Sequence, residues 1–231
     1  MLYESNSQGS ALKGEKMKQS KEQNFERDLP VGYRQALYIN AKSAKFGLIF
    51  NLIALAVLVL VMIAAVILLR VGGRLSVGIL QMDFPQLLLA ELTLIGSLLV
   101  YIVLHELVHG IAYKARTGEK LTFGISWSCA FCGVPRIYTY RKTALIAVLA
   151  PFTVFTLVLI PILALLYFLS PLYFLIVALV FGLHLGGCSG DLYVTYLLLT
   201  KFKDSKTLMR DTGPEQFFYI PEEGSEGSVN N

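Results

Sequence analysis

The sequence predicts an all-α polytopic membrane protein with about four transmembrane helices and a small cytoplasmic β-hairpin between the second and third spans. Hydrophobic residues make up 55% of the 231 residues and the mean hydropathy is +0.61, whereas soluble domains contain about 45–50% apolar residues. The apolar residues also form stretches near or beyond the ~20 residues that a helix needs to cross a bilayer. The predicted spans are 47–69, 86–112, 144–169 and 171–199.

The distribution of Lys and Arg predicts the orientation of these spans. Eight basic residues precede the first span, two follow it, six lie between Lys114 and Lys142, and four follow the last span. Because cytoplasmic loops carry an excess of Lys and Arg, we expect a multi-pass protein of the cell membrane with both termini in the cytoplasm. The net charge of +4 then reflects topology and contact with an anionic lipid bilayer, and no nucleic-acid partner is expected.

Polar segments flank the apolar core at residues 46–200. Residues 1–45 are rich in Ser, Gln, Lys and Glu, a composition that buries too little apolar surface to fold, so a disordered cytoplasmic tail is expected. Residues 201–231 are predicted to form a second polar cytoplasmic tail.

Two local signals refine the helices. Asp83-Phe84-Pro85 is a typical helix start, because Asp accepts hydrogen bonds from free amides and Pro suits the first helical turn. The glycine-rich stretch 186–190 in the fourth span predicts a close backbone approach or a local break.

The connection at 121–140 differs in pattern from the spans. Phe123, Ile125 and Trp127 alternate with small or polar residues, and this period of two favours a strand. The run 136–140 is β-branched and aromatic, with a turn signal at 132–135 between the two runs. We expect a hairpin against the cytoplasmic face, the alternative being an irregular amphipathic loop.

The second span contains the motif His105-Glu106-Leu107-Val108-His109. On a helix the two histidines lie one turn apart on one face, so both imidazoles can bind one Zn²⁺, while Glu106 can act as a general base toward an attacking water. Ionisable residues at membrane depth are costly and are by default candidates for a functional site. The structural alternative is a hydrogen-bonded polar cluster that joins helices.

A catalytic zinc usually takes three protein ligands. Asp191 is the favoured third ligand, because counting along the spans places it at the same depth as His105, close to the cytoplasmic end. His184 is the competitor. It precedes Asp191 by seven residues and lies about 10 Å further from the cytoplasm on a regular helix. His184 is therefore an alternative ligand, a residue that supports a ligand, or a histidine hydrogen-bonded between helices.

Other candidates are weaker. Glu91 lies fifteen residues before Glu106, too far from the metal on one helix. Cys129 and Cys132 form a single C-x-x-C without a partner pair, and two small structural residues are favoured over a metal site. Cys188 is expected to be a small packing residue.

The motif residues resemble a known family. His-Glu-Leu-Val-His-Gly at the inner end of a span, Ala150-Pro151-Phe152 in the next, and Gly190-Asp191 near the end are similar to the bacterial zincin-like membrane metallopeptidases, a group distantly related to the site-2 proteases. The resemblance covers about residues 86–200. It implies that His105, His109 and Asp191 bind one zinc ion per chain and that Glu106 is the catalytic base. The chain lacks the Asn-containing segment and the Asn-Pro-Asp-Gly motif of site-2 proteases.

The leading hypothesis is zinc-dependent intramembrane or membrane-surface proteolysis of a membrane protein or membrane-associated peptide. The substrate is expected to add as a strand to the hairpin at Phe123, Ile125 and Trp127. A second hypothesis keeps the zinc and changes the substrate to a lipid-linked amide or ester. The non-enzymatic alternative is a metal-binding scaffold or a transport component.

Overall fold

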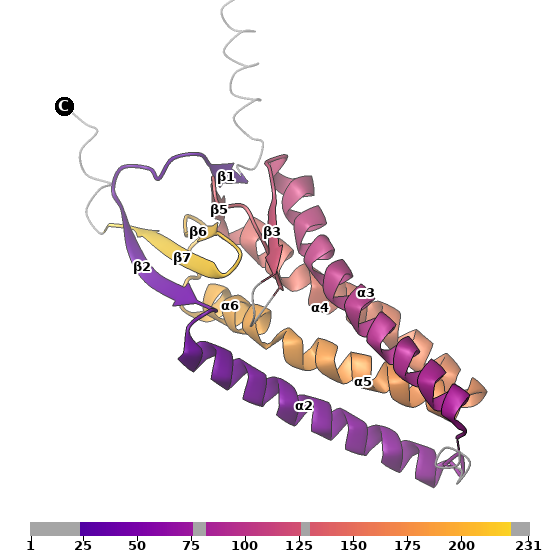
Figure 1. The fold of residues 1–231 in the computed structure, drawn as a ribbon. Helices are drawn as coiled ribbons and strands as arrows, with labels where there is room; N and C mark the ends of the chain where they lie inside the picture. Colours follow the sequence, from indigo (N-terminus) through magenta and orange to yellow (C-terminus); the bar gives the residue numbers. More distant parts are fainter. Residues whose placement is uncertain (1–23, 76–81, 126–129, 223–231) are drawn as a thin grey trace, which may run out of the picture.

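Four long apolar helical segments dominate the structure, a computed structural model that describes residues 24–75, 82–125 and 130–222 (Figure 1). By length and composition alone, each is able to cross a membrane. The expectation of four such segments is confirmed. They are α2 (Ala44–Val71), α3 (Phe84–Thr117), α4 (Arg141–Leu169), and the pair α5 (Pro171–Gly187) and α6 (Ser189–Thr200).

The start of α3 follows the predicted capping chemistry. The Asp83 carboxylate accepts the Gln86 backbone N–H at 2.9 Å, and the Gln86 side chain accepts the Asp83 N–H at 3.3 Å. This reciprocal capping box satisfies two amides that have no partner within the helix. At the other end Gly118 closes α3 with a φ of 70°, a left-handed conformation that glycine adopts without a Cβ clash.

Small residues allow α5 to pack closely on α2. A Cβ on Gly186 would lie 2.6 Å from the Cα of Ala54, so a larger residue would push the two backbones apart. Gly182 and Gly186 lie four residues apart on one helix face, the spacing with which membrane helices approach closely. One residue later the helix breaks: α5 ends at Gly187 and α6 begins at Ser189. The structure thus contains both the close approach and the break that the glycine-rich stretch predicts.

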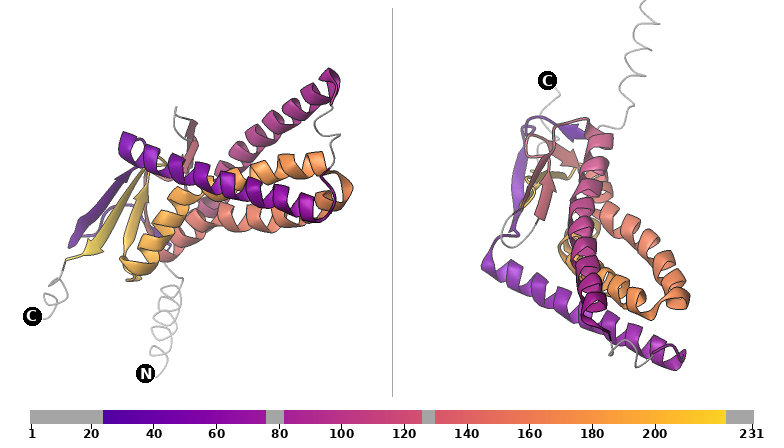
Figure 2. Two further views of the ribbon diagram at one scale, coloured as in Figure 1. Left: turned by 90° about the horizontal axis from the view of Figure 1, so that it is seen from below. Right: turned by 45° about the vertical axis from the view of Figure 1, so that its right-hand side comes forward.

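A five-stranded antiparallel sheet lies at one end of the helices, where α2 and α4 begin and α3 and α6 end (Figures 1 and 2). The strand order is β1-β5-β6-β7-β2, and β2 pairs with β7 along most of its length. The strands are β1 (Phe25–Glu26), β2 (Tyr33–Asn40), β5 (Tyr138–Tyr140), β6 (Leu208–Asp211) and β7 (Glu215–Pro221).

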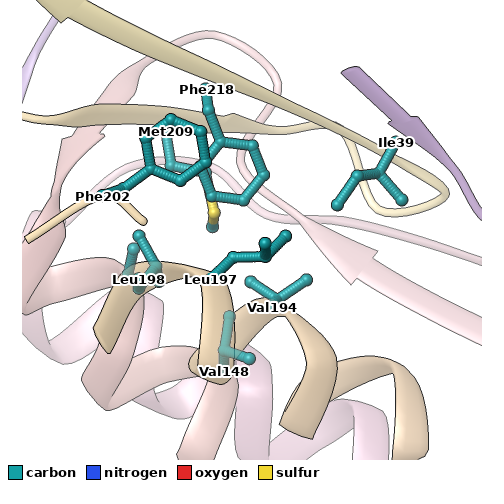
Figure 3. Packing of buried hydrophobic residues seen from close by; sticks show 9 residues of the cluster. Ile39, Val148, Val194, Leu197, Leu198, Phe202, Met209 and Phe218 are labelled. Atoms are coloured by element: carbon teal, nitrogen blue, oxygen red, sulfur yellow. The ribbon is translucent and has the colours of Figure 1, made fainter. Parts of the chain in front are cut away.

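A hydrophobic core attaches this sheet to α4 and α6 (Figure 3). Met209 and Phe218 of the sheet are fully buried, and the ring of Phe202 stacks on Phe218 with centroids 4.8 Å apart. Full burial of such side chains contributes about 1.5–3 kcal/mol each. Because Val194 and Leu198 lie in the same core, the sheet holds α6, the helix that carries Asp191.

Strands form in both segments that flank the apolar core, which differs from the disordered tail expected at residues 1–45. Residues 33–40 and 215–221 form paired strands, and 208–211 form a third. Each segment alone buries little apolar surface, but pairing supplies backbone partners and covers the core. Residues 1–23 and 223–231 lie outside the described part of the chain.

The connection after α3 also pairs differently from the prediction. β3 (Thr122–Ile125) and β4 (Ala130–Gly133) form a separate two-stranded antiparallel sheet. The run 136–140 instead contributes β5 to the five-stranded sheet. The predicted turn at 132–135 therefore links two sheets, because β5 pairs with β1 and β6, which come from distant parts of the chain. Trp127 lies outside the described residues.

Candidate metal centre

A polar stripe on α3 forms one side of the candidate site. Tyr101, His105, His109 and Tyr113 recur every four residues, a spacing that places them on one face of the helix. His109 and Tyr113 are buried, with 8% and 1% of their surfaces exposed. The stripe faces the protein interior at the cytoplasmic end predicted for α3.

Asp191 completes a compact group with the two histidines. It stands in the first turn of α6, just after the break at Cys188. Its Oδ2 lies 3.4 Å from His105 Nε2 and 3.5 Å from His109 Nε2. The structure therefore brings together the three residues that the sequence analysis selects as metal ligands.

The donor atoms fit a zinc ion. Two ligand atoms about 2.0–2.1 Å from a tetrahedral zinc ion lie about 3.4 Å from each other, which matches both separations from Asp191 Oδ2. The donor set of two imidazoles and one carboxylate is typical of catalytic zinc sites, which leave the fourth position for water or substrate. These three residues are therefore the ones that would hold the metal.

A proline in α4 orients His109. Pro151 lies inside α4 and has no N–H, so it leaves the carbonyl of Ala147, four residues earlier, without its helical partner. His109 Nδ1 donates to this carbonyl at 2.8 Å. A carbonyl only accepts, so Nδ1 carries a proton and Nε2 is the nitrogen that can bind a metal beside Asp191.

His184 lies beside His105, on the opposite side from Asp191. It is fully buried, and its Nδ1 lies 3.1 Å from the Tyr101 hydroxyl, which is also 3.0 Å from His105 Nδ1. His105, His184 and Cys188 form a second group whose ligand atoms lie within 4.8 Å of one another. Either group has the spacing for a metal, but the group with Asp191 matches the donor set of catalytic zinc sites.

Glu106 stands where three cavities meet. One of about 150 Å³ contains the metal group, one of about 310 Å³ runs between α2, α3 and α5, and one of about 460 Å³ lies between α3 and the hairpin. Cys132 of β4 lines the metal cavity together with Glu106. The candidate base therefore lies beside β4, at the place that the three cavities share.

The cavity beside the hairpin carries the predicted substrate-binding residues that the structure describes. Phe123 is 50% exposed and Ile125 is 83% exposed. Both line this cavity together with Ile102 and Leu107 of α3. The third residue, Trp127, lies outside the described ranges.

A buried acid outside the spans borders the metal cavity. Asp211 accepts a hydrogen bond from the Tyr113 hydroxyl at 2.7 Å and from the Gly213 N–H at 2.8 Å. Burial raises the pKa of its carboxyl to about 6, despite these two donors. Burial also raises the pKa of the Cys132 thiol to about 12, so this thiol is protonated and unreactive at neutral pH. Cys129 lies outside the described residues, and Glu91 is exposed on α3.

The sequence analysis missed Tyr101, Asp211 and the role of Pro151. Tyr101 carries a detectable signal, because it precedes His105 by four residues and shares its helix face. Pro151 also carries one, since a proline inside a helix always frees one carbonyl. No comparable signal marks Asp211, whose place depends on the pairing of β6 with strands from distant parts of the chain.

Comparison with known proteins agrees with this geometry. Residues 98–206 match the model of a family described as "Putative zincin peptidase". The match includes His105, Glu106, His109 and Asp191 and supports a zinc metallopeptidase. No curated protein and no solved structure matches the chain.

Proposed function

We propose that this protein is a zinc-dependent membrane peptidase of the site-2 protease type, which hydrolyses a peptide bond of a membrane-associated substrate. The observation that carries the proposal is the placement of Glu106 beside the group of His105, His109 and Asp191, at the meeting point of three cavities. The similarity to a zincin peptidase family over residues 98–206 supports it. One zinc ion per chain is expected.

Each residue of the site has a chemical role in this proposal. The bound zinc would act as a Lewis acid on the substrate carbonyl and lower the pKa of water. Glu106 accepts a proton from the attacking water and returns it to the leaving amine. Asp191, His105 and His109 hold the metal.

The substrate binds as an added strand along β3 in this proposal. β3 pairs with β4 alone among the described strands, so its other edge is free to pair with an extended peptide. The exposed side chains of Phe123 and Ile125 supply apolar contacts in the cavity that ends at Glu106, and Trp127 is proposed as a third contact. We further propose that the four apolar segments span the cell membrane, with both termini in the cytoplasm.

The substitution Glu106→Gln tests the function most sharply. Gln cannot accept the proton, so cleavage should fall by about 10²- to 10⁴-fold, while zinc content stays unchanged because Glu106 is not a ligand. The assay uses vesicles that contain both the chain and a single-span model protein tagged at each end, with fragments identified by mass spectrometry. Cleavage by Glu106→Gln at the wild-type rate would contradict the proposal. Hydrolysis of a lipid-linked amide or ester in place of the peptide would favour the second hypothesis.

A further inference from the structure

We propose that Tyr101 is a positioning residue of the metal centre, whose hydroxyl links His105 to His184 and holds His105 in the tautomer that leaves Nε2 free for zinc. This inference rests on the zinc site of the proposed function and adds residues outside the motif His105–His109. It concerns metal binding, so it can be tested without a substrate.

The contacts form one continuous chain. The Tyr101 hydroxyl lies 3.0 Å from His105 Nδ1 and 3.1 Å from His184 Nδ1. On the far side of the second ring, His184 Nε2 lies 3.1 Å from the Thr156 hydroxyl. The chain therefore runs from His105 on α3 through His184 on α5 to Thr156 on α4.

The metal position decides the direction of the hydrogen bonds. His105 Nε2 lies beside Asp191 and must keep its lone pair to bind a metal there, so the proton of the neutral ring is on Nδ1. His105 Nδ1 then donates to the Tyr101 hydroxyl, which in turn donates to His184 Nδ1. His184 therefore carries its proton on Nε2, next to the Thr156 hydroxyl. In the reverse direction His105 Nε2 would carry a proton and could not bind a metal.

Aromatic rings enclose the chain. The Phe155 ring packs against Tyr101 with centroids 5.1 Å apart and stacks near His105 at 6.4 Å. Phe152 and Phe181 lie within about the same range of the His184 ring, at 6.0 and 6.1 Å. An apolar surround strengthens hydrogen bonds and makes an unpaired polar group costly. Reversing one hydrogen bond of the chain would therefore leave a polar group unpaired.

A second metal ion is the competing explanation for this cluster. His105, His184 and Cys188 have the required spacing, and Cys188 Sγ lies 3.6 Å from His184 Nδ1. The Tyr101 hydroxyl contacts Nδ1 of both histidines, so an ion bound through these atoms would have to displace it. The arrangement therefore favours a hydrogen-bond chain.

The test is the zinc affinity of the full-length chain in detergent, measured by competition with a chromogenic chelator. Tyr101→Phe removes the hydroxyl and keeps the ring against Phe155. It should weaken zinc binding by about 10- to 100-fold, the usual effect of losing a partner of a metal-binding histidine. Tyr173→Phe, near the start of α5, is the matched control and should bind zinc as the wild type does. His184→Ala should weaken binding similarly, and the double variant should be no weaker than the weaker single variant, because both act through one chain.

Unchanged affinity in Tyr101→Phe would overturn the inference, as would effects of the two single variants that multiply. Two zinc ions per chain, with one lost in Cys188→Ala, would replace it with the second metal site. A wild-type chain that binds no zinc would remove the inference together with the metal centre. A chain that binds zinc and responds as predicted, but hydrolyses no peptide, would leave it standing and remove the proposed function.

A measurement on the wild type gives the tautomers directly, so the result does not depend on whether a variant folds correctly. The chain has three histidines, so ¹⁵N shifts of labelled histidine give the tautomer of each, with His184→Ala identifying the His184 signals. We expect the His184 proton on Nε2 and the His105 proton on Nδ1. A His184 proton on Nδ1 would contradict the inference, because the Tyr101 hydroxyl could then not donate to this atom. A contact with only a structural role would allow either direction.

Discussion

The two sides of Glu106 are built differently. On the metal side, His109 and His184 are buried, and their rings hydrogen-bond to groups on neighbouring helices. On the substrate side, β3 exposes Ile125 at 83% beside an apolar cavity. A metal site needs fixed geometry, whereas a surface that accepts varied peptide side chains needs shape and apolar area. Metal binding and substrate binding should therefore respond to different substitutions.

On the metal side, the fixed geometry includes a proline that makes helix α4 less stable. A proline inside a helix costs about 3 kcal/mol relative to alanine. At Pro151 the lost helical hydrogen bond is replaced by the one from His109 to Ala147. Stability and metal binding should therefore change in opposite directions when this residue is altered.

Among the substitutions that separate the two sides of Glu106, the largest expected effect on binding comes from Pro151→Ala. The new N–H of residue 151 would compete with His109 for the Ala147 carbonyl, so zinc affinity should fall by about tenfold, while the melting temperature of the zinc-free chain should rise. Chelator competition and thermal unfolding measure the two quantities on one sample.

Pro161 supplies the matched control in the same helix. Pro161→Ala should also raise the melting temperature but leave zinc affinity unchanged, because none of the described metal-group residues contacts its freed carbonyl. Equal loss of zinc affinity in both variants would show that α4 acts through general distortion.

On the substrate side, Ile125→Pro should lower turnover and leave zinc affinity unchanged. It removes one backbone donor from β3, and a net hydrogen bond of about 0.5–1.5 kcal/mol corresponds to about a twofold to tenfold loss. The vesicle cleavage assay and the chelator titration measure the two effects.

Ile125→Ala is the control, because it shortens the side chain and keeps the N–H. A larger loss in Ile125→Pro than in Ile125→Ala supports strand addition. Full turnover in the proline variant would remove that step from the proposal.

The smallest effect on zinc binding and turnover is expected at Asp211, which should act on stability alone. Its pKa is raised to about 6 in the folded chain, so the folded state binds the proton more tightly than the unfolded state. This stabilisation is complete below about pH 4 and is lost as the pH rises from about 4 to about 6, a change on the order of 2–3 kcal/mol.

Asp211→Asn cannot ionise and should lack this loss. Its melting temperature relative to the wild type, both zinc-free, should therefore rise by several degrees between pH 4 and pH 7. Asn can still accept from Gly213 and donate to the Tyr113 oxygen, so the local contacts are retained. If the melting temperatures of the two chains change in parallel between pH 4 and pH 7, ionisation of Asp211 does not destabilise the folded chain.

The helices and the metal group could be predicted from the sequence because their signals are local. The apolar runs fix the spans, Asp83 and Gln86 fix the start of α3, and the spacing of His105 and His109 is set by the helix itself. The prediction of Asp191 as a ligand required one further step, because counting along two spans had to place it at the same depth as His105.

The sheet and the supporting contacts could not be predicted in the same way. β2 and β7 pair over a separation of about 180 residues, and neither strand has an apolar pattern strong enough to identify it alone. The partners of His105 and His109 depend on how α4 and α5 pack against α3, so Pro151 and His184 are recognisable as polar or irregular positions, but their partners are not.

The most direct measurement of the central claim is the zinc content of the detergent-purified wild type beside His109→Ala, Asp191→Ala and His184→Ala. The account predicts about one zinc per chain in the wild type, loss of zinc in the first two variants, and zinc retained with weaker affinity in the third. Zinc retained in Asp191→Ala and lost entirely in His184→Ala would contradict it, because the third ligand would then be His184.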